Sequence, residues 1–249
     1  MQNISIDIQK PTKSHLLQLN PNIFFDKIFI INLPNSTERW NKICKNLINN
    51  GIFNFERQVG ISLPRKPPED FIPKKFYYNF EAYGGRFKTD PDYILNCVGT
   101  NLAHFNIVKK SHMRNYKRIL ILEDDAFLDS KFNIHFKKGI FNLLQSNYDW
   151  DLFYFGFKRS RPQFKCHKIN NYISKPTQFI RGAYGYALNS SIFPILLKSQ
   201  LYGGMEIDVF FEFVICRICR VLCFTPTIIS HRDGMTSTIT KKKWKVRDF

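Results

Sequence analysis

Long hydrophobic runs are missing from this sequence. No stretch approaches the roughly 18 uncharged apolar residues that a membrane-spanning helix requires, which points away from an integral membrane protein. Residues 1–11 also lack the basic region followed by an apolar region that marks a signal peptide. From these two absences we expect a soluble protein that remains in the cytoplasm.

Cysteine and glycine are not abundant either. Six cysteines in 249 residues are too few for a disulfide scaffold, and 12 glycines without a triplet period exclude a collagen-like chain. Cys216, Cys219 and Cys223, with Cys166 and His167 as an outside pair, raise the hypothesis of a zinc site. Their spacing matches no standard finger. Because these cysteines alternate with aliphatic residues, we expect small buried hydrophobes with reduced thiols instead.

Acidic residues are few relative to basic ones. The 37 Lys and Arg against 20 Asp and Glu give a formal net charge of +17, which favours anionic partners such as nucleotides, nucleic acid, acidic glycans or a membrane surface. The basic residues are spread along the chain, and no helix-turn-helix, zinc-finger or RNA-recognition motif is visible. A nucleic-acid-binding protein is therefore an alternative rather than the first interpretation.

What the sequence does contain is enough apolar material for a core. With 44% hydrophobic and 16% aromatic residues, the chain can form one large α/β domain. Apolar runs predict strands, and helical spacing predicts helices between them. The expected strands are 27–32, 53–57, 118–122, 150–155, 184–188 and 222–225, and the expected helices are 35–50, 95–113, a segment ending at 144, 192–199 and 209–219.

The ends of the first helix carry recognisable signals. Asn35 is the expected N-cap, Glu38 would complete a capping box, and Gly51 is the expected stop. The alternation of strands and helices predicts a mostly parallel sheet with helices on both faces. Outside it we expect a polar lead segment at 1–25 and a basic tail at 241–249, and within the domain at 26–240 an irregular proline-rich excursion or lid at 60–94.

The clearest chemical signal is Glu123-Asp124-Asp125, directly after the predicted strand at 118–122. Ligands of open α/β sheets bind beyond the carboxyl ends of the strands. Three adjacent carboxylates repel one another, and a divalent cation such as Mg²⁺ or Mn²⁺, shared with phosphate oxygens, would relieve that repulsion. The alternative is an acidic start to the following helix, which accounts for one acid better than for three.

Several short motifs occur in a distinctive order. They are 28–33 followed by Glu38-Arg39-Trp40, then Gly99-Thr100-Asn101-Leu102-Ala103-His104, the acidic cluster within 121–126, the segment 181–188, Ile207-Asp208-Val209 and the closing segment 226–237. Over roughly residues 27–238 this order resembles glycosyltransferase family 25, the group of lipopolysaccharide-type and collagen galactosyltransferases. Ala103 replaces the serine usual in that family, and the 60–94 stretch matches no family motif.

The resemblance implies a GT-A-like, Rossmann-like fold and a UDP-hexose donor, with galactose or glucose as the sugar. It also implies Mn²⁺ (or Mg²⁺) and transfer, with inversion, to a hydroxyl of a glycan or protein. In this picture Asp125 would hold the metal with Glu123 or Asp124 beside it, and His231 would be a late ligand. Contact with a membrane surface stays open.

The resemblance also assigns further residues. Asp208, with Glu206 as second choice, would be the general base that takes the acceptor's proton. A second set would face the donor, with Asn32 and Arg39 near the uracil and diphosphate, His104 in contact with it, and Arg232 near phosphate.

Each of these residues also has a plain structural interpretation. Asp208 or Glu206 could cap a helix, His104 could be a hydrogen-bonded core residue, and Arg39 and His231 could be surface residues. Two further function classes remain as alternatives. One is a metal-dependent phosphohydrolase, and the other is a glycosyltransferase-like scaffold without catalysis.

Overall fold

The computed structural model describes residues 13–64, 91–146, 148–159, 165–177, 180–199 and 205–232. Residues 1–12 of the predicted lead segment, residues 65–90 of the proline-rich excursion and the basic tail lie outside these ranges. The description that follows concerns the described residues alone.

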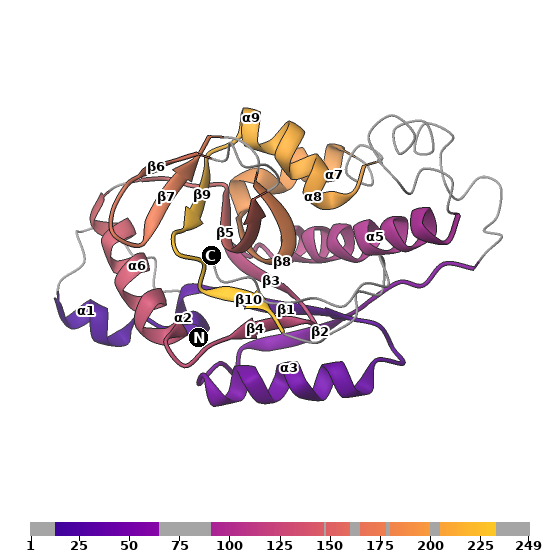
Figure 1. Ribbon diagram of the computed structural model, residues 1–249, viewed down its shortest axis with the longest axis horizontal. Coiled ribbons are helices and arrows are strands. Elements are labelled where there is room, and N and C mark those ends of the chain that lie inside the picture. Colours follow the sequence, from indigo (N-terminus) through magenta and orange to yellow (C-terminus); the bar gives the residue numbers. More distant parts are fainter. Residues whose placement is uncertain are drawn as a thin grey trace.

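A mixed sheet in the order β2-β1-β3-β8-β5-β9-β7-β6 forms the centre of the molecule (Figure 1). β8 lies between β3 and β5 and pairs antiparallel with both. β7 lies between β9 and β6 and is also antiparallel to both. β8 and β7 therefore run opposite to the other six strands. The predicted mostly parallel sheet is thus confirmed. The strands are β1 (Lys27–Asn32), β2 (Phe55–Val59), β3 (Arg118–Glu123), β5 (Leu152–Arg159), β6 (Cys166–Lys168), β7 (Ile173–Pro176), β8 (Ile180–Asn189) and β9 (Val221–Phe224). A second, two-stranded sheet pairs β4 (Ala126–Leu128) with β10 (Ile229–His231).

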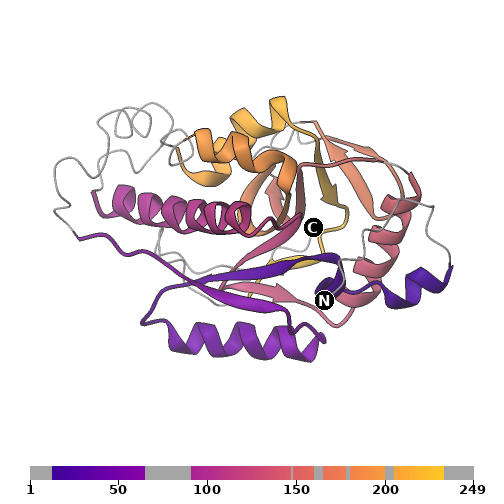
Figure 2. The same ribbon diagram turned by 180° about the vertical axis from the view of Figure 1, so that it is seen from behind.

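Helices cover both faces of this sheet (Figures 1 and 2). One face carries α3 (Thr37–Asn49) and α6 (Phe132–Ser146), with α1 (Lys13–Gln18) and α2 (Pro21–Phe24) beside them. The other face carries α5 (Pro91–Met113), α7 (Phe193–Lys198) and α8 (Ile207–Phe210). The remaining short elements are η2 (Ser190–Ile192), the π-helical turn η4 (Phe211–Ile215) and α9 (Cys216–Ile218).

The continuous apolar runs are explained by burial on both sides. In β1, Ile28 and Ile30 belong to the core under α3 and α6, whereas Phe29 between them belongs to the core under α5. Successive side chains of a strand point to opposite faces, so a strand covered on both faces has no position left for a polar residue. β3 repeats the pattern with Leu120 and Ile121.

The predicted capping box is wrong. The helix begins at Thr37, Ser36 holds the N-cap position without a side-chain cap hydrogen bond, and Glu38 pairs with Lys42 one turn along. The stop is confirmed, because Gly51 has a φ of 68° and its N–H donates to the Ile48 carbonyl.

The region after the acidic cluster also differs from expectation. No helix follows directly: the chain turns, forms β4 and only then enters α6. The strands β4, β6, β7 and β10 were not predicted, because each has only three or four residues and shows no usable periodicity. The predicted last helix is divided into α8, η4 and α9.

The cysteines lie in different environments. Cys223 is buried in β9, Cys216 and Cys219 pack against the core, and Cys166 is exposed on β6. All six thiols are free. Among the helices of the described ranges, none is both long and apolar enough to cross a bilayer.

An ion pair between the buried Asp151 and the half-exposed Arg220 joins the amino-terminal ends of β5 and β9. The Asp151 carboxylate accepts hydrogen bonds from the Arg220 backbone N–H at 2.8 Å, the Arg220 Nη2 at 2.8 Å and the Ser191 hydroxyl at 2.5 Å. Burial would raise the pKa of Asp151, but the hydrogen bonds from Arg220 and Ser191 outweigh it and lower the pKa to about 2.

Replacing Asp151 by Ala should lower the free energy of unfolding at pH 7 by about 2 kcal/mol, because the Arg220 backbone N–H and Ser191 lose a charged acceptor and the half-exposed Arg220 side chain can turn to water. In the wild type this stabilisation is present above the unfolded pKa near 4 and is lost as the pH falls toward about 2. Urea unfolding across pH 2–7 measures both effects. Asp149→Ala is the control, since the exposed Asp149 meets the same Arg220 at 2.8 Å and should cost below about 1 kcal/mol. Equal losses in the two variants would contradict this account.

Candidate functional site

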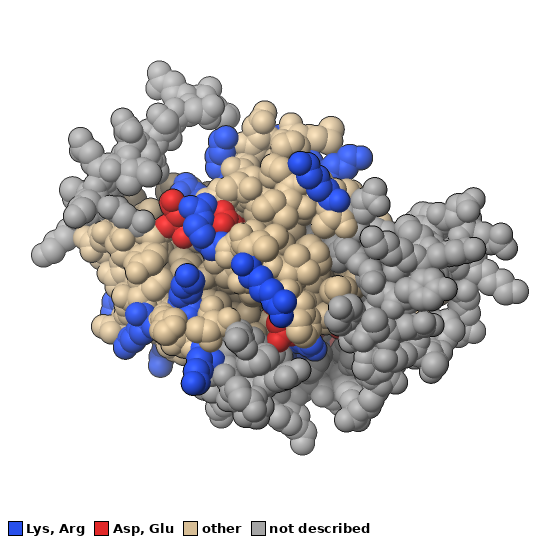
Figure 3. Space-filling view, turned by 90° about the horizontal axis from the view of Figure 1, so that it is seen from above, with Lys and Arg blue, Asp and Glu red and all other residues tan. Residues whose placement is uncertain are grey.

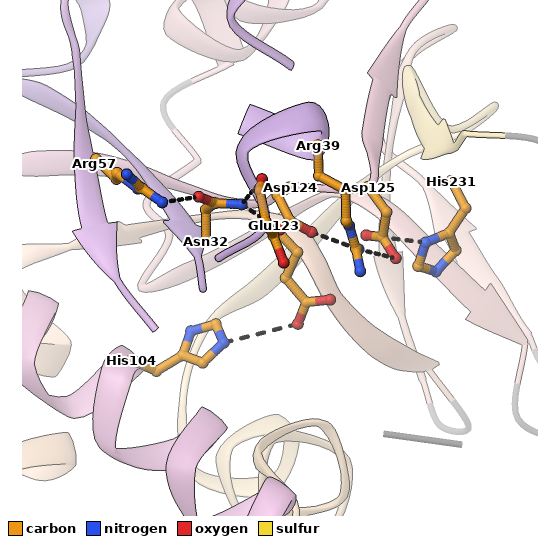
Figure 4. A network of polar contacts seen from close by, with 9 residues as sticks. Asn32, Arg39, Arg57, His104, Glu123, Asp124, Asp125 and His231 are labelled. Carbon is orange, nitrogen blue, oxygen red and sulfur yellow. Dashed lines mark hydrogen bonds and ion pairs between the residues drawn. The ribbon is translucent and has the colours of Figure 1, made fainter. Parts of the chain in front are cut away.

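The site lies where the neighbouring strands β1 and β3 end. In their parallel register Ile31 is paired with Glu123, so Asn32 and the acidic residues that follow β3 emerge at the same edge of the sheet. The structure places Asn32, Arg39, His104 and His231 around these acids (Figure 4). Residues separated by up to two hundred positions in the chain thus meet within a few ångströms.

Asn32 connects the acids to the edge strand β2. Its Nδ2 donates to Asp124 Oδ2 at 2.6 Å and to the Ser36 carbonyl at 3.1 Å, and its Oδ1 accepts from the Arg57 guanidinium. Asn32 is only 1% exposed. The sequence analysis identified Asn32 but missed Arg57, which reaches the site only because β2 pairs with β1.

Arg39, in the first turn of α3, contacts two of the acids at once. Its Nη2 is ion-paired with Asp124 Oδ1 and lies 3.3 Å from Asp125 Oδ2. Burial raises the pKa of Asp124 to about 6, although the Arg39 charge and the Asn32 hydrogen bond act in the opposite direction.

His231 approaches Asp125 from the other side. The pairing of β10 with β4 places His231 opposite Ala126, and the Nδ1 of His231 lies 3.4 Å from Asp125 Oδ1. The Arg232 backbone N–H donates to the Asp125 carbonyl at 2.7 Å, which fixes the two segments together. Burial would raise the pKa of Asp125, but the contact with His231 and the charge of Arg39 hold it below its usual value.

Arg232 itself extends elsewhere. Its guanidinium donates to the Lys42 carbonyl on α3 at 3.2 Å and lies over the Phe127 ring. The structure therefore brings the Arg232 backbone, and not its guanidinium, into contact with the acids.

His104 is completely buried in α5. Its Nδ1 lies 2.7 Å from the Tyr186 hydroxyl, and its Nε2 lies 3.8 Å from Glu123 Oε1. Burial lowers the pKa of His104 to about 3, so the imidazole is neutral at neutral pH. Burial and the Asp125 charge raise the pKa of Glu123 to about 7. This side of the cluster therefore presents weakly charged groups.

The segment with Glu206 and Asp208 borders the cluster from α8. Glu206 holds the N-cap position and accepts a hydrogen bond from the Tyr93 hydroxyl, whereas Asp208 lies within the first turn. The structure thus places Asp208 inside the helix rather than at its cap. Burial raises the pKa of Asp208, and the Asp208 charge contributes to the raised pKa of Glu123.

Two basic residues of the site were missed in the sequence, Lys158 near the acids and Arg181 near Asp208. Lys158 lies toward the end of β5, where burial lowers its pKa to about 8 against the opposing effect of Asp125 and Glu123. Arg181 of β8 is paired with Glu212. The strand prediction stopped at residue 155, so Lys158 was not recognised as part of a strand that reaches the site.

A pocket opens beside the acids, between the ends of β1 and β2 and helix α5. Its lining is Ile31, Asn32, Leu33, Gly60, Ile61, Ser62, Asn96, Gly99, Thr100, Ala103, Glu123 and Asp124. Gly99 allows helix α5 to pack this closely, because a Cβ there would lie 2.1 Å from the Ile61 carbonyl oxygen.

The fit of a metal ion to these residues is limited to two donors. In the described part of the chain, no group of three or more His, Cys, Asp or Glu side chains is arranged to hold a metal. Asp125 Oδ1 is buried without a hydrogen-bond partner, and it faces the His231 imidazole. A carboxylate oxygen with an imidazole nitrogen is a donor set that suits Mn²⁺, provided that a ligand supplies the remaining oxygens.

Comparisons with known proteins agree with the motif order. The chain spans less than a third of the length of the curated relatives that follow. A procollagen galactosyltransferase 1 of Danio rerio is 27% identical over 203 residues, covering 75% of this chain and 31% of that protein. Procollagen galactosyltransferase 1-B of Xenopus laevis is 31% identical over 141 residues, covering 54% of this chain and 22% of that protein. An inactive glycosyltransferase 25 family member 3 of Homo sapiens is 26% identical over 149 residues, covering 57% of this chain and 23% of that protein.

One solved structure is a glycosyltransferase involved in the glycosylation of the major capsid of PBCV-1. It matches with a TM-score of 0.42 at 12% identity, covering 84% of this chain and 93% of its own. The sequence model of glycosyltransferase family 25, described as an LPS biosynthesis protein, matches residues 25–211. That match includes the acidic cluster and the Asp208 segment, and it confirms the resemblance seen in the motifs. The chain belongs to glycosyltransferase family 25.

Proposed function

We propose that this chain is a metal-dependent, inverting glycosyltransferase that transfers a hexose, galactose or glucose, from a UDP-sugar to a hydroxyl of a glycan or protein. One observation carries the proposal: in a family 25 chain, Asn32, Arg39 and His231 converge on the buried acids at the carboxyl end of the sheet. The names of the procollagen galactosyltransferases support galactose as the sugar and a protein as the acceptor.

The pocket beside the acids is the proposed site of the nucleoside. Its wall includes the side chains of Asn96, Thr100 and Ser62, which offer the neutral donors and acceptors that a uracil requires. At one end it meets Asp124 and Glu123. A nucleoside bound there would direct its diphosphate toward the acids and Arg39, whose guanidinium suits phosphate oxygens.

Asp125 and His231 are the residues that would hold the metal, together with the donor's phosphate oxygens. A bound Mn²⁺ or Mg²⁺ would neutralise the charge that develops on the departing UDP. Asn32 keeps Asp124 in place by its hydrogen bond at 2.6 Å, and the Arg232 backbone fixes Asp125 relative to β10. The acids are thus already oriented before a donor binds.

Asp208 is the proposed general base. As the acceptor oxygen bonds to the sugar carbon and the bond to UDP breaks, the hydroxyl proton passes to the Asp208 carboxylate. Burial raises the pKa of Asp208, which makes the carboxylate a better proton acceptor. Glu206 is the second candidate, although its carboxylate already accepts a hydrogen bond from Tyr93.

The competing functions have less support. On the face shown in Figure 3, basic side chains are scattered and form no continuous stripe of the kind that binds nucleic acid. A phosphohydrolase would use a carboxylate and histidine cluster for two metals, and the described residues hold no group of three metal-binding side chains. An inactive scaffold is the remaining candidate, since an inactive family member is among the relatives.

The direct test measures UDP release from a panel of UDP-hexoses with Mn²⁺ or with EDTA. We expect slow hydrolysis of one donor that requires Mn²⁺, and Asp125→Asn should lower it by at least ~10²-fold while the protein remains folded. If no UDP-hexose releases UDP and UDP shows no Mn²⁺-dependent binding, the result would favour an inactive glycosyltransferase-like scaffold.

The role of Asp208 has its own test. Asp208→Asn should abolish sugar transfer and retain UDP binding, because an amide cannot take the acceptor's proton. Initial rates and UDP titration measure the two quantities, with Glu206→Gln in parallel. Loss of UDP binding in Asp208→Asn would move this residue to the donor pocket, and a larger rate loss in Glu206→Gln would make Glu206 the base.

The substitution Gly99→Ala tests whether the pocket beside the acids binds the nucleoside. A Cβ at Gly99 would lie 2.1 Å from the Ile61 carbonyl oxygen, so Gly99→Ala must displace α5 or the segment after β2. We expect UDP affinity to fall by about tenfold or more, since one misplaced wall removes several contacts. Gly51→Ala is the control: its φ of 68° makes a side chain unfavourable, with nothing within 4 Å, so about 1 kcal/mol of stability should be lost. Its UDP affinity should not change. Wild-type UDP affinity in Gly99→Ala would place the nucleoside elsewhere.

A further inference from the structure

The Arg39 guanidinium occupies the space between the two acids that follow Glu123. It contacts Asp124 and Asp125 together, and in Figure 4 it lies between their carboxylates. The Arg39 side chain is 17% exposed, and those of Asp124 and Asp125 are 9% and 6% exposed. This is an ion pair largely shielded from water, in which each charge depends on its partner.

A divalent cation held by Asp125 Oδ1 and His231 would lie against the carboxylate whose other oxygen, Oδ2, faces Arg39. Such cations bind carboxylate oxygen at about 2.0–2.6 Å, whereas Asp125 Oδ2 already faces Arg39 at 3.3 Å. Two positive charges cannot both lie against one carboxylate at these distances without strong repulsion. The other titratable groups facing the acids are His231, Lys158 and Asp208. Arg39 is the group whose displacement would free oxygens of both Asp124 and Asp125.

A nucleoside diphosphate offers Arg39 a replacement partner. Guanidinium groups bind phosphate oxygens through paired hydrogen bonds at least as well as they bind carboxylates. Arg39 lies in the first turn of α3, directly after the loop from Asn32, which also lines the pocket. A diphosphate extending from that pocket toward the acids comes within reach of the Arg39 side chain.

We propose that Arg39 is the resident counter-ion of Asp124 and Asp125 and releases them to a divalent cation only when a nucleoside diphosphate accepts its guanidinium. The proposal rests on the proposed function. Its consequence is that metal and donor bind as a pair: the cation binds weakly alone, UDP strengthens its binding, and the cation strengthens that of UDP by the same factor.

The experiment measures free Mn²⁺ by electron paramagnetic resonance while the full chain is titrated, without UDP and with saturating UDP. The proteins are the wild type, Arg39→Gln and Arg114→Gln. Arg114, at the exposed end of α5 near Glu56, provides a matched loss of one positive charge away from the acids.

We expect Arg39→Gln to bind Mn²⁺ about tenfold or more tightly than the wild type in the absence of UDP, because the competing charge is gone. The wild type should gain at least about tenfold in Mn²⁺ affinity from UDP, and Arg39→Gln should gain much less. Arg114→Gln should match the wild type in both conditions.

Equal Mn²⁺ affinity of Arg39→Gln and the wild type without UDP would overturn the inference and leave the proposed function intact. Absence of Mn²⁺ binding in both proteins, even with UDP, would overturn both. If Arg39→Gln does not fold, Arg39→Lys is the variant that tests the inference, since it keeps the charge without the paired hydrogen bonds. A gain from UDP as large in Arg39→Lys as in the wild type would contradict the proposal.

Discussion

Repulsion among three consecutive carboxylates is the constraint around which this structure is arranged. Glu123, Asp124 and Asp125 lie at the end of a strand that is buried on both faces, and Asp124 and Asp125 are themselves buried, so water screens these two charges poorly. Positive and hydrogen-bonding groups therefore gather there from separate elements. Arg39 comes from α3 and His231 from β10, while Arg57 of β2 acts through Asn32.

The same neighbourhood divides into two sides of different character. Toward α3 and β10, Asp125 keeps a lowered pKa and contacts cations directly. Toward α5, the neutral His104 and the raised pKa of Glu123 leave little charge. Negative charge is thus concentrated toward α3 and β10, whereas the side toward α5, where the pocket opens, carries little charge.

Much of this arrangement could be predicted from local patterns. The buried strand before the acids and the helix that begins near Arg39 are continuous in sequence, so their meeting at one sheet edge follows from parallel pairing. Lys158 could not be found this way, because the predicted strand ended at residue 155, directly before Gly156. In the structure a Cβ at Gly156 would lie 2.5 Å from the Ile229 carbonyl oxygen. The glycine is needed because the Ile229 backbone approaches this closely. The strand β5 continues past Gly156, with two register shifts, to Arg159. The contact of His104 with Tyr186 depends on packing between α5 and β8, which no local pattern encodes.

The short ribbon of β4 and β10 has a consequence for variation within such chains. The region that matches the family ends at residue 211, yet His231 reaches Asp125 from beyond it through the backbone pairing with Ala126. A substitution of His231 would therefore exchange one proposed ligand and leave the acidic cluster unchanged. Two family members with identical acidic motifs could then prefer different cations because they differ within the three residues of β10.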